Sequence, residues 1–189
     1  EIGAVKLLGG SVVDSFGTLV NPGVPLAPKI TKITGITDIM LRDQPTAKTA
    51  IAQLLAFIGD CAVAAHNARF DMAILQTELR RLGLSFQAPQ IDTLAFARKL
   101  YPQLKSHRLK AVCRALGISL KNAHRAVNDA TATAQCLDRM LEAAREMGAL
   151  GMRDLNVVIQ GGAVGEHYHA ILLAATQKGM ENLNRLVSA

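Results

Sequence analysis

The first twenty residues divide into two apolar runs separated by a turn signal. Apolar positions dominate residues 1–8 and 12–20, and between them lies Gly9-Gly10, a pair favoured in tight hairpin turns. The pattern predicts two strands joined as a β-hairpin. Asn21-Pro22 ends the second strand, and we expect a turn-rich stretch from Pro25 to Pro45.

Helical spacing begins after this segment. Thr46 is a suitable cap for a helix whose apolar residues recur three or four positions apart as far as Ile58. The apolar run Cys61–Ala65 predicts a short buried strand, and Asp92 suits an N-cap. The further predicted helices are one through Leu75, Leu79 and Leu82 that Gly83 closes, then Thr93–Leu100, His107–Leu116 and Asp129–Met147.

This order of elements predicts an α/β fold in which a small sheet is covered by helices. The chain opens inside its first predicted strand, and a sheet of three strands is small for shielding its faces. We therefore expect the fold to lack its first strand, with that strand preceding Glu1.

Composition narrows the class of protein. A chain of 189 residues with 19% charged residues is the size of one domain plus a short appendage. The three cysteines, Cys61, Cys113 and Cys136, lie far apart in apolar runs, which predicts buried, reduced thiols in a cytoplasmic protein. No apolar run reaches the roughly 18 residues of a membrane span, so we expect no membrane partner.

The net charge of +6 and pI of about 9.5 favour a polyanionic partner. Lysines and arginines scattered over solvated helix faces explain the charge equally well. Aromatic residues make up 4% of the chain, too few for a long base-stacking platform.

Two carboxylates and one imidazole occupy positions that a core would not favour. Asp71 lies on the apolar stripe of its predicted helix, and Asp129 shares a stripe with Thr133 and Cys136. His124 lies five residues before Asp129, so a loop before the helix lets both face one site. Taken singly, each has a simpler explanation: a favourable charge at a helix start for Asp71, or a polar loop histidine for His124.

Together these three residues suit metal-assisted hydrolysis of phosphodiesters. Carboxylate ligands indicate Mg²⁺ or Mn²⁺, and His124 is suited to take a proton from the attacking water. A pair of divalent ions requires more carboxylates than Asp71 and Asp129, so at least one further acidic group must come from elsewhere.

Two motifs carry a family resemblance. His66-Asn67-Ala68-Arg69-Phe70-Asp71 resembles the second motif of the DnaQ-like, DEDDh-type 3′→5′ exonucleases, and His124-Arg125-Ala126-Val127-Asn128-Asp129 resembles their third. The resemblance implies a ribonuclease H-like fold, a mixed sheet flanked by helices, over residues 1–147. It also implies two divalent ions on Asp71 and Asp129, His124 as the general base, and His66, Asn67 and Phe70 as substrate-binding residues.

The resemblance is closer still to the exonuclease insert of the PolC-type bacterial DNA polymerase III α subunits. The segment Tyr168–Ser188 resembles the start of the PHP-like segment that follows the insert in those polymerases, with a strand at Tyr168–Ala174 and then a helix. The implied domains are a truncated exonuclease at 1–147 and a linker with the PHP-like start at 148–189. The implied partners are a single-stranded DNA 3′ end, the rest of the polymerase and the replisome, with a sliding clamp as a candidate.

The family's first motif, an Asp-x-Glu pair on the first strand, has no counterpart from Glu1 onward. We therefore expect the chain alone to be inactive. The implied activity of the complete domain is proofreading of DNA, releasing 5′-mononucleotides. An RNA-trimming DEDDh exoribonuclease and a non-catalytic nucleic-acid-binding remnant are the alternatives.

Overall fold

The structure is a computed structural model, and it describes residues 1–120, 125–149 and 151–160. His124 and the predicted strand Tyr168–Ala174 lie outside the described residues. The strands are β1 (Ile2–Leu8), β2 (Ser11–Thr18), β3 (Val63–Ala65) and β4 (Gln90–Asp92). The helices are α1 (Pro28–Thr34), α2 (Asp38–Leu41), α3 (Ala47–Ile58), α4 (Ala68–Leu82), α5 (Thr93–Leu100), α6 (Leu109–Ala115), α7 (Ala126–Glu146) and α8 (Met152–Gln160).

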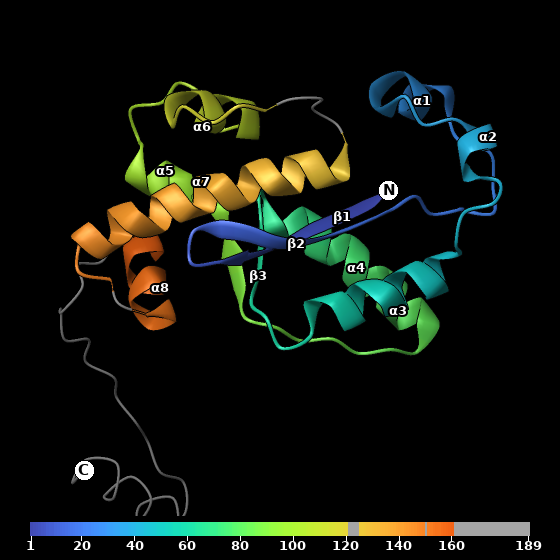
Figure 1. The fold of residues 1–189 in the computed structure, drawn as a ribbon, viewed down its shortest axis with the longest axis horizontal. Coiled ribbons are helices and arrows are strands. Elements are labelled where there is room, and N and C mark those ends of the chain that lie inside the picture. Colours follow the sequence, from blue (N-terminus) through green and yellow to red (C-terminus); the bar gives the residue numbers. More distant parts are fainter. Residues whose placement is uncertain (121–124, 150, 161–189) are drawn as a thin grey trace, which may run out of the picture.

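The predicted hairpin is confirmed. β1 and β2 pair antiparallel, from Ile2 opposite Thr18 to Leu8 opposite Ser11. Gly9 and Gly10 have φ values of 55° and 81°, and two successive positive values suit a turn that follows the twist of the strands. The hairpin lies against the long helix α7 (Figure 1).

Because Gly3 and Gly17 have no side chains, the hairpin backbone can lie directly against the start of α7. A Cβ placed on Gly3 would lie 2.7 Å from Cβ of Ala126 and closer still to the backbone of Ala126 and Val127. A Cβ on Gly17 would lie 2.5 Å from Cγ2 of Val127. No larger residue fits at Gly3 without moving the start of α7, because the atoms it would meet belong to the main chain.

The sheet is in two parts among the described residues. β1 pairs with β2, and β3 pairs with β4 in parallel, with Val63 opposite Gln90 and Ala65 opposite Asp92. One pair is antiparallel and the other parallel, so the described strands form two small sheets in an α/β arrangement and not one continuous mixed sheet. Helix α7 contacts β1, β2 and β3 and so spans both parts.

The hydrophobic core lies where α5, α6, α7 and α8 meet, around the part of α7 beyond the hairpin turn (Figure 1). Phe96, Val112 and Met140 are fully buried there. Leu155 and Val158 of α8 join the same core. This packing fixes α7 on one side, and the hairpin holds it on another.

Several predicted helices and caps are confirmed. Thr46 accepts a hydrogen bond from the backbone of Thr49 at the start of α3, and Asp92 accepts one from Leu94 at the start of α5. Gly83 closes α4 in the left-handed conformation. These are local interactions, within three residues of one another, which is why the sequence pattern predicts them.

Other predictions are wrong. The segment predicted as turns contains α1 and α2, because Pro28 begins a helix, Gly35 ends it with φ of 72°, and the Thr37 side chain caps the next one. The strand after Cys61 is shorter and less buried than predicted, and Cys61 itself is exposed. Cys113 and Cys136 are buried and unbridged, as predicted.

Candidate active site

The predicted second-motif residues lie at the junction between β3 and α4. Asn67 is the N-cap of α4 and adopts φ 72° and ψ 52°, and it is the non-glycine residue with positive φ in the described part of the chain. Asparagine tolerates this left-handed conformation better than most residues. The turn brings Asp71 into the first turn of α4, and it leaves the Asn67 side chain without a capping hydrogen bond.

The His66 ring is hydrogen-bonded to two segments that lie far from it in the sequence. Its Nε2 lies 2.8 Å from the carbonyl oxygen of His107, so Nε2 carries the proton and donates. Its Nδ1 lies 3.1 Å from the hydroxyl of Thr93, which is fully buried at the start of α5. Burial lowers the pKa of His66, and the His107 carbonyl and the charge of Asp92 partly oppose that shift. Both ring nitrogens are therefore engaged with the protein itself.

Asp92 ties the same junction together. Its Oδ1 accepts hydrogen bonds from the backbone N–H of Asn67 at 3.1 Å and of Leu94 at 2.9 Å. One carboxylate thus caps α5 and fixes the turn that precedes α4. The local sequence pattern does not predict the hydrogen bond between Asp92 and Asn67, because 25 residues separate them.

Asp71 is exposed at the start of α4, beside Phe70, whose side chain is also exposed at 62%. Neighbouring protein atoms nevertheless displace enough water to raise the pKa of the Asp71 carboxyl. Its backbone N–H opposes the shift, and the negative charge of Asp92 adds to it. A cation near Asp71 would relieve this unfavourable environment for the ionised carboxylate.

Asp129 lies in the first turn of α7 and is half-buried. The residues that share its stripe, Thr133, Cys136 and Met140, are buried, which agrees with the predicted inward direction. Its charge helps to raise the pKa of the Cys113 thiol, after the larger effect of burial. Since α7 begins at Ala126, position 124 precedes this helix in the chain.

Within the described ranges, no group of three or more histidine, cysteine or acidic side chains is arranged to hold a metal ion. The second-motif residues come together with Asp92 and Thr93, whereas Asp129 lies on a different helix. The described residues therefore supply two predicted carboxylate ligands, Asp71 and Asp129. Two carboxylates do not complete the oxygen-rich environment that a pair of divalent ions requires.

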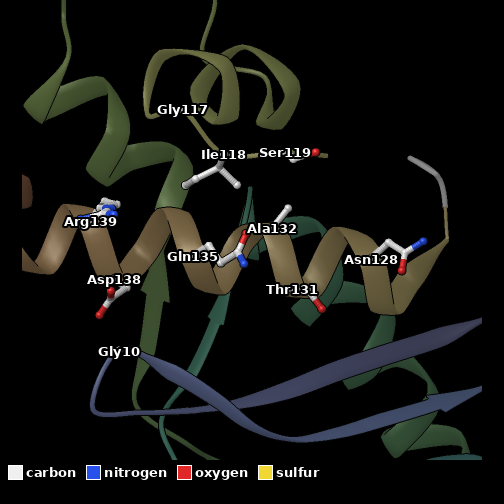
Figure 2. Close-up of a pocket in the computed structure, with 10 residues that line it drawn as sticks. All are labelled: Gly10, Gly117, Ile118, Ser119, Asn128, Thr131, Ala132, Gln135, Asp138 and Arg139. Atoms are coloured by element: carbon white, nitrogen blue, oxygen red, sulfur yellow. The ribbon is translucent and has the colours of Figure 1, made fainter. Parts of the chain in front are cut away.

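A polar groove of about 560 Å³ lies elsewhere on α7. Figure 2 shows it along the helix, between the hairpin turn at Gly10 and the loop at Gly117. Its other lining residues are Ile118, Ser119, Asn128, Thr131, Ala132, Gln135, Asp138 and Arg139. Asp71, Asp129, His66, Asn67 and Phe70 do not line this groove, but Asn128, which does, directly precedes Asp129 in the chain.

Comparison with known proteins defines the class. The family model for exonucleases of the RNase T type matches residues 1–137, well over half of the chain. The chain therefore belongs to this exonuclease family, whose members generally depend on divalent metal ions. None of the helices in the described ranges is both long and apolar enough to span a membrane.

The similar curated proteins are all DNA polymerases of one type. DNA polymerase III PolC-type from Halalkalibacterium halodurans is 43% identical over 191 residues, and the enzyme of the same name from Bacillus subtilis is 42% identical over 193. That from Thermotoga maritima is 37% identical over 192 residues. Each alignment covers all of this chain but 13–14% of the polymerase. The chain thus matches one exonuclease-sized segment of much longer proteins.

Solved structures show the same fold. Exonuclease X, in complex with 5′ overhanging duplex DNA, superposes with a TM-score of 0.62 and is 25% identical, covering 82% of this chain and 87% of that one. A 3′-exonuclease that recognises the histone mRNA stem-loop superposes with a TM-score of 0.59 at 17% identity, covering 71% of this chain and 66% of that one. These neighbours agree with the predicted ribonuclease H-like fold.

Proposed function

We propose that this chain is the 3′→5′ proofreading exonuclease domain of a replicative DNA polymerase, which removes mispaired nucleotides from DNA as 5′-monophosphates. The observation that carries the proposal is the position of the two motif aspartates. Asp71 and Asp129 each lie in the first turn of a helix, on α4 and α7. The similarity to PolC-type polymerases along the whole chain supports DNA as the substrate.

The proposed metal ligands are the carboxylates of Asp71 and Asp129, and the proposed ions are two Mg²⁺ or Mn²⁺. When bound, the ions would activate the attacking water and stabilise the attacking and leaving oxygens. Partial loss of water around Asp71, and the charge of Asp92, raise the pKa of its carboxyl. A bound cation would favour the ionised form.

Further carboxylates must complete the site. β1 and β3 each pair with a single strand in the described part of the chain, and α7 contacts both. A further strand pairing with these edges would carry the Asp-x-Glu pair that the family resemblance implies.

The remaining roles follow from position. His124, just before α7 in the sequence, takes the proton from the attacking water. Phe70 offers an exposed ring on which the terminal base can stack. The Asn67 side chain makes no capping bond and is available to the terminal nucleotide. His66, with both ring nitrogens engaged by protein atoms, supports the turn on which Asn67 lies.

The unpaired 3′ end of a mismatched primer separates more easily from its template than a paired end does, and this supplies part of the selectivity for mismatches.

The proposal is tested by digestion of a 5′-labelled primer with a mismatched 3′ end, using a polymerase chain that contains this domain. We expect metal-dependent shortening from the 3′ end. Asp129→Ala should abolish it, and His124→Ala should slow it by roughly 10²–10⁴-fold, as expected for loss of a general base. Asp154→Asn on α8 is the control and should cleave normally. Full activity of Asp129→Ala would refute the proposal, and faster digestion of RNA than of DNA would refute the assigned substrate.

A further inference from the structure

The start of α7 is held by Glu1, which lies 124 residues before Arg125 in the sequence. The Glu1 carboxylate accepts two hydrogen bonds: Oε1 from Nε of Arg125 at 3.0 Å, and Oε2 from the backbone N–H of Ala126 at 3.2 Å. The Glu1 side chain is 12% exposed and that of Arg125 is 50% exposed. The carboxylate therefore reaches the helix from beside β1 with both oxygens engaged.

The Glu1 carboxylate takes the place of an N-cap side chain for α7. Arg125 is the N-cap of α7 but makes no side-chain capping bond, and the first N–H groups of a helix have no partner within it. Glu1 provides one acceptor from outside the helix. Its negative charge also lies at the positive end of the helix dipole.

The same turn carries Asp129. The backbone N–H of Asp129 donates to the carbonyl of Arg125 at 3.0 Å, and the N–H of Asn128 donates to it at 2.9 Å. The peptide that Glu1 fixes through Ala126 is thus the one that begins the hydrogen bonding of the Asp129 turn. Gly3 in β1 brings the backbone of this turn against the hairpin.

From this geometry we infer that Glu1 is a positioning residue for the exonuclease reaction. It touches neither the reacting atoms nor the proposed metal ligands directly. Through Arg125 and Ala126 it sets the direction of the Asp129 carboxylate at the start of α7. The inference rests on the proposed function, because it assigns Glu1 to the same site.

The test compares Glu1→Gln with wild type in a polymerase chain that contains the domain. The amide keeps the size of the side chain, but its –NH₂ cannot accept the hydrogen bond that a carboxylate oxygen accepts. We expect kcat for excision to fall by about tenfold and the Mg²⁺ concentration for half-maximal rate to rise, as is typical when a supporting group around a metal ligand is lost. KM for the DNA primer should stay within about twofold, because Glu1 contacts the start of α7 and neither Asn67 nor Phe70, the proposed substrate-binding residues.

Arg125→Gln provides a second route to the same contact. Because both variants break one interaction, the double variant should be no slower than the slower single variant. The matched control is Glu142→Gln, which removes a 3.1 Å ion pair with Arg139 on the exposed face of the same helix. This variant should retain the wild-type kcat and Mg²⁺ dependence.

The outcomes separate the inference from the proposed function. If wild type excises 3′ nucleotides and Asp129→Ala does not, while Glu1→Gln keeps the wild-type kcat and Mg²⁺ dependence, the positioning role is refuted and the nuclease assignment stands. If Glu1→Gln and Arg125→Gln lose activity only in proportion to a fall in melting temperature, the role is structural and the inference also fails. An inactive wild type would refute the proposed function itself, and with it the inference.

Discussion

Substituting Gly3 by alanine should destabilise the protein strongly, because β1 approaches α7 too closely for a side chain. The added Cβ would lie 2.7 Å from Cβ of Ala126, at least 0.7 Å inside the 3.4–4 Å of an ordinary contact, and closer still to main-chain atoms of Ala126 and Val127. Overpacking costs typically about 1–3 kcal/mol. Since main-chain atoms cannot rotate away, we expect a loss near the upper end, about 3 kcal/mol.

For a domain of this size, each kcal/mol lowers the melting temperature by roughly 2–4 °C. Gly3→Ala should therefore melt about 6–12 °C below wild type when unfolding is followed by circular dichroism. Gly151→Ala is the control for adding a methyl group, because a Cβ at Gly151 would meet no atom within 4 Å and the residue has no positive φ. Gly151 precedes α8 and its carbonyl accepts the first bond of that helix from Leu155, so alanine there should cost no more than about 1 kcal/mol. Equal melting temperatures for the two variants would show that the hairpin does not pack on α7 as described.

Two further predictions concern side chains in and near the site. The raised pKa of Asp71 means that its contribution to stability is fully present below its usual pKa of 3.8 and is lost as the pH rises through the folded-state value. In chelator at pH 7, Asp71→Asn should therefore melt above wild type, with a difference that shrinks toward pH 4; a lower melting temperature at pH 7 would contradict this. Exposed Cys61 should react at once with a thiol reagent, whereas Cys113 and Cys136, buried and with raised pKa values, should react only on unfolding. Equal labelling rates for all three cysteines in the folded protein would refute that assignment.

Much of the helical structure was predictable from the sequence, because its signals are local. Thr46 and Asp92 cap the helices that follow them, and Gly83 ends α4. The short helices α1 and α2 were missed because the prolines and glycines between residues 25 and 45 also signal turns. β4 was missed because a three-residue strand is too short to show a period.

The candidate site was predictable only in part. The motif pattern indicated Asp71 and Asp129, and the buried stripe below Asp129 agrees with its predicted direction. The contacts that support the site join distant residues: Glu1 with Arg125, and His66 with His107. A local sequence pattern cannot predict such pairs, because only the folded structure brings the two residues together. These supporting contacts are therefore visible only in the folded chain.

The central claim is that Asp71 and Asp129 bind the same pair of metal ions. The most direct measurement is the anomalous diffraction of Mn²⁺ in crystals of a polymerase chain that contains this domain, with a DNA 3′ end bound. We expect manganese peaks within bonding distance of both carboxylates, next to the last phosphodiester of the primer. Manganese bound elsewhere, with Asp71 and Asp129 on separate surfaces, would contradict the claim.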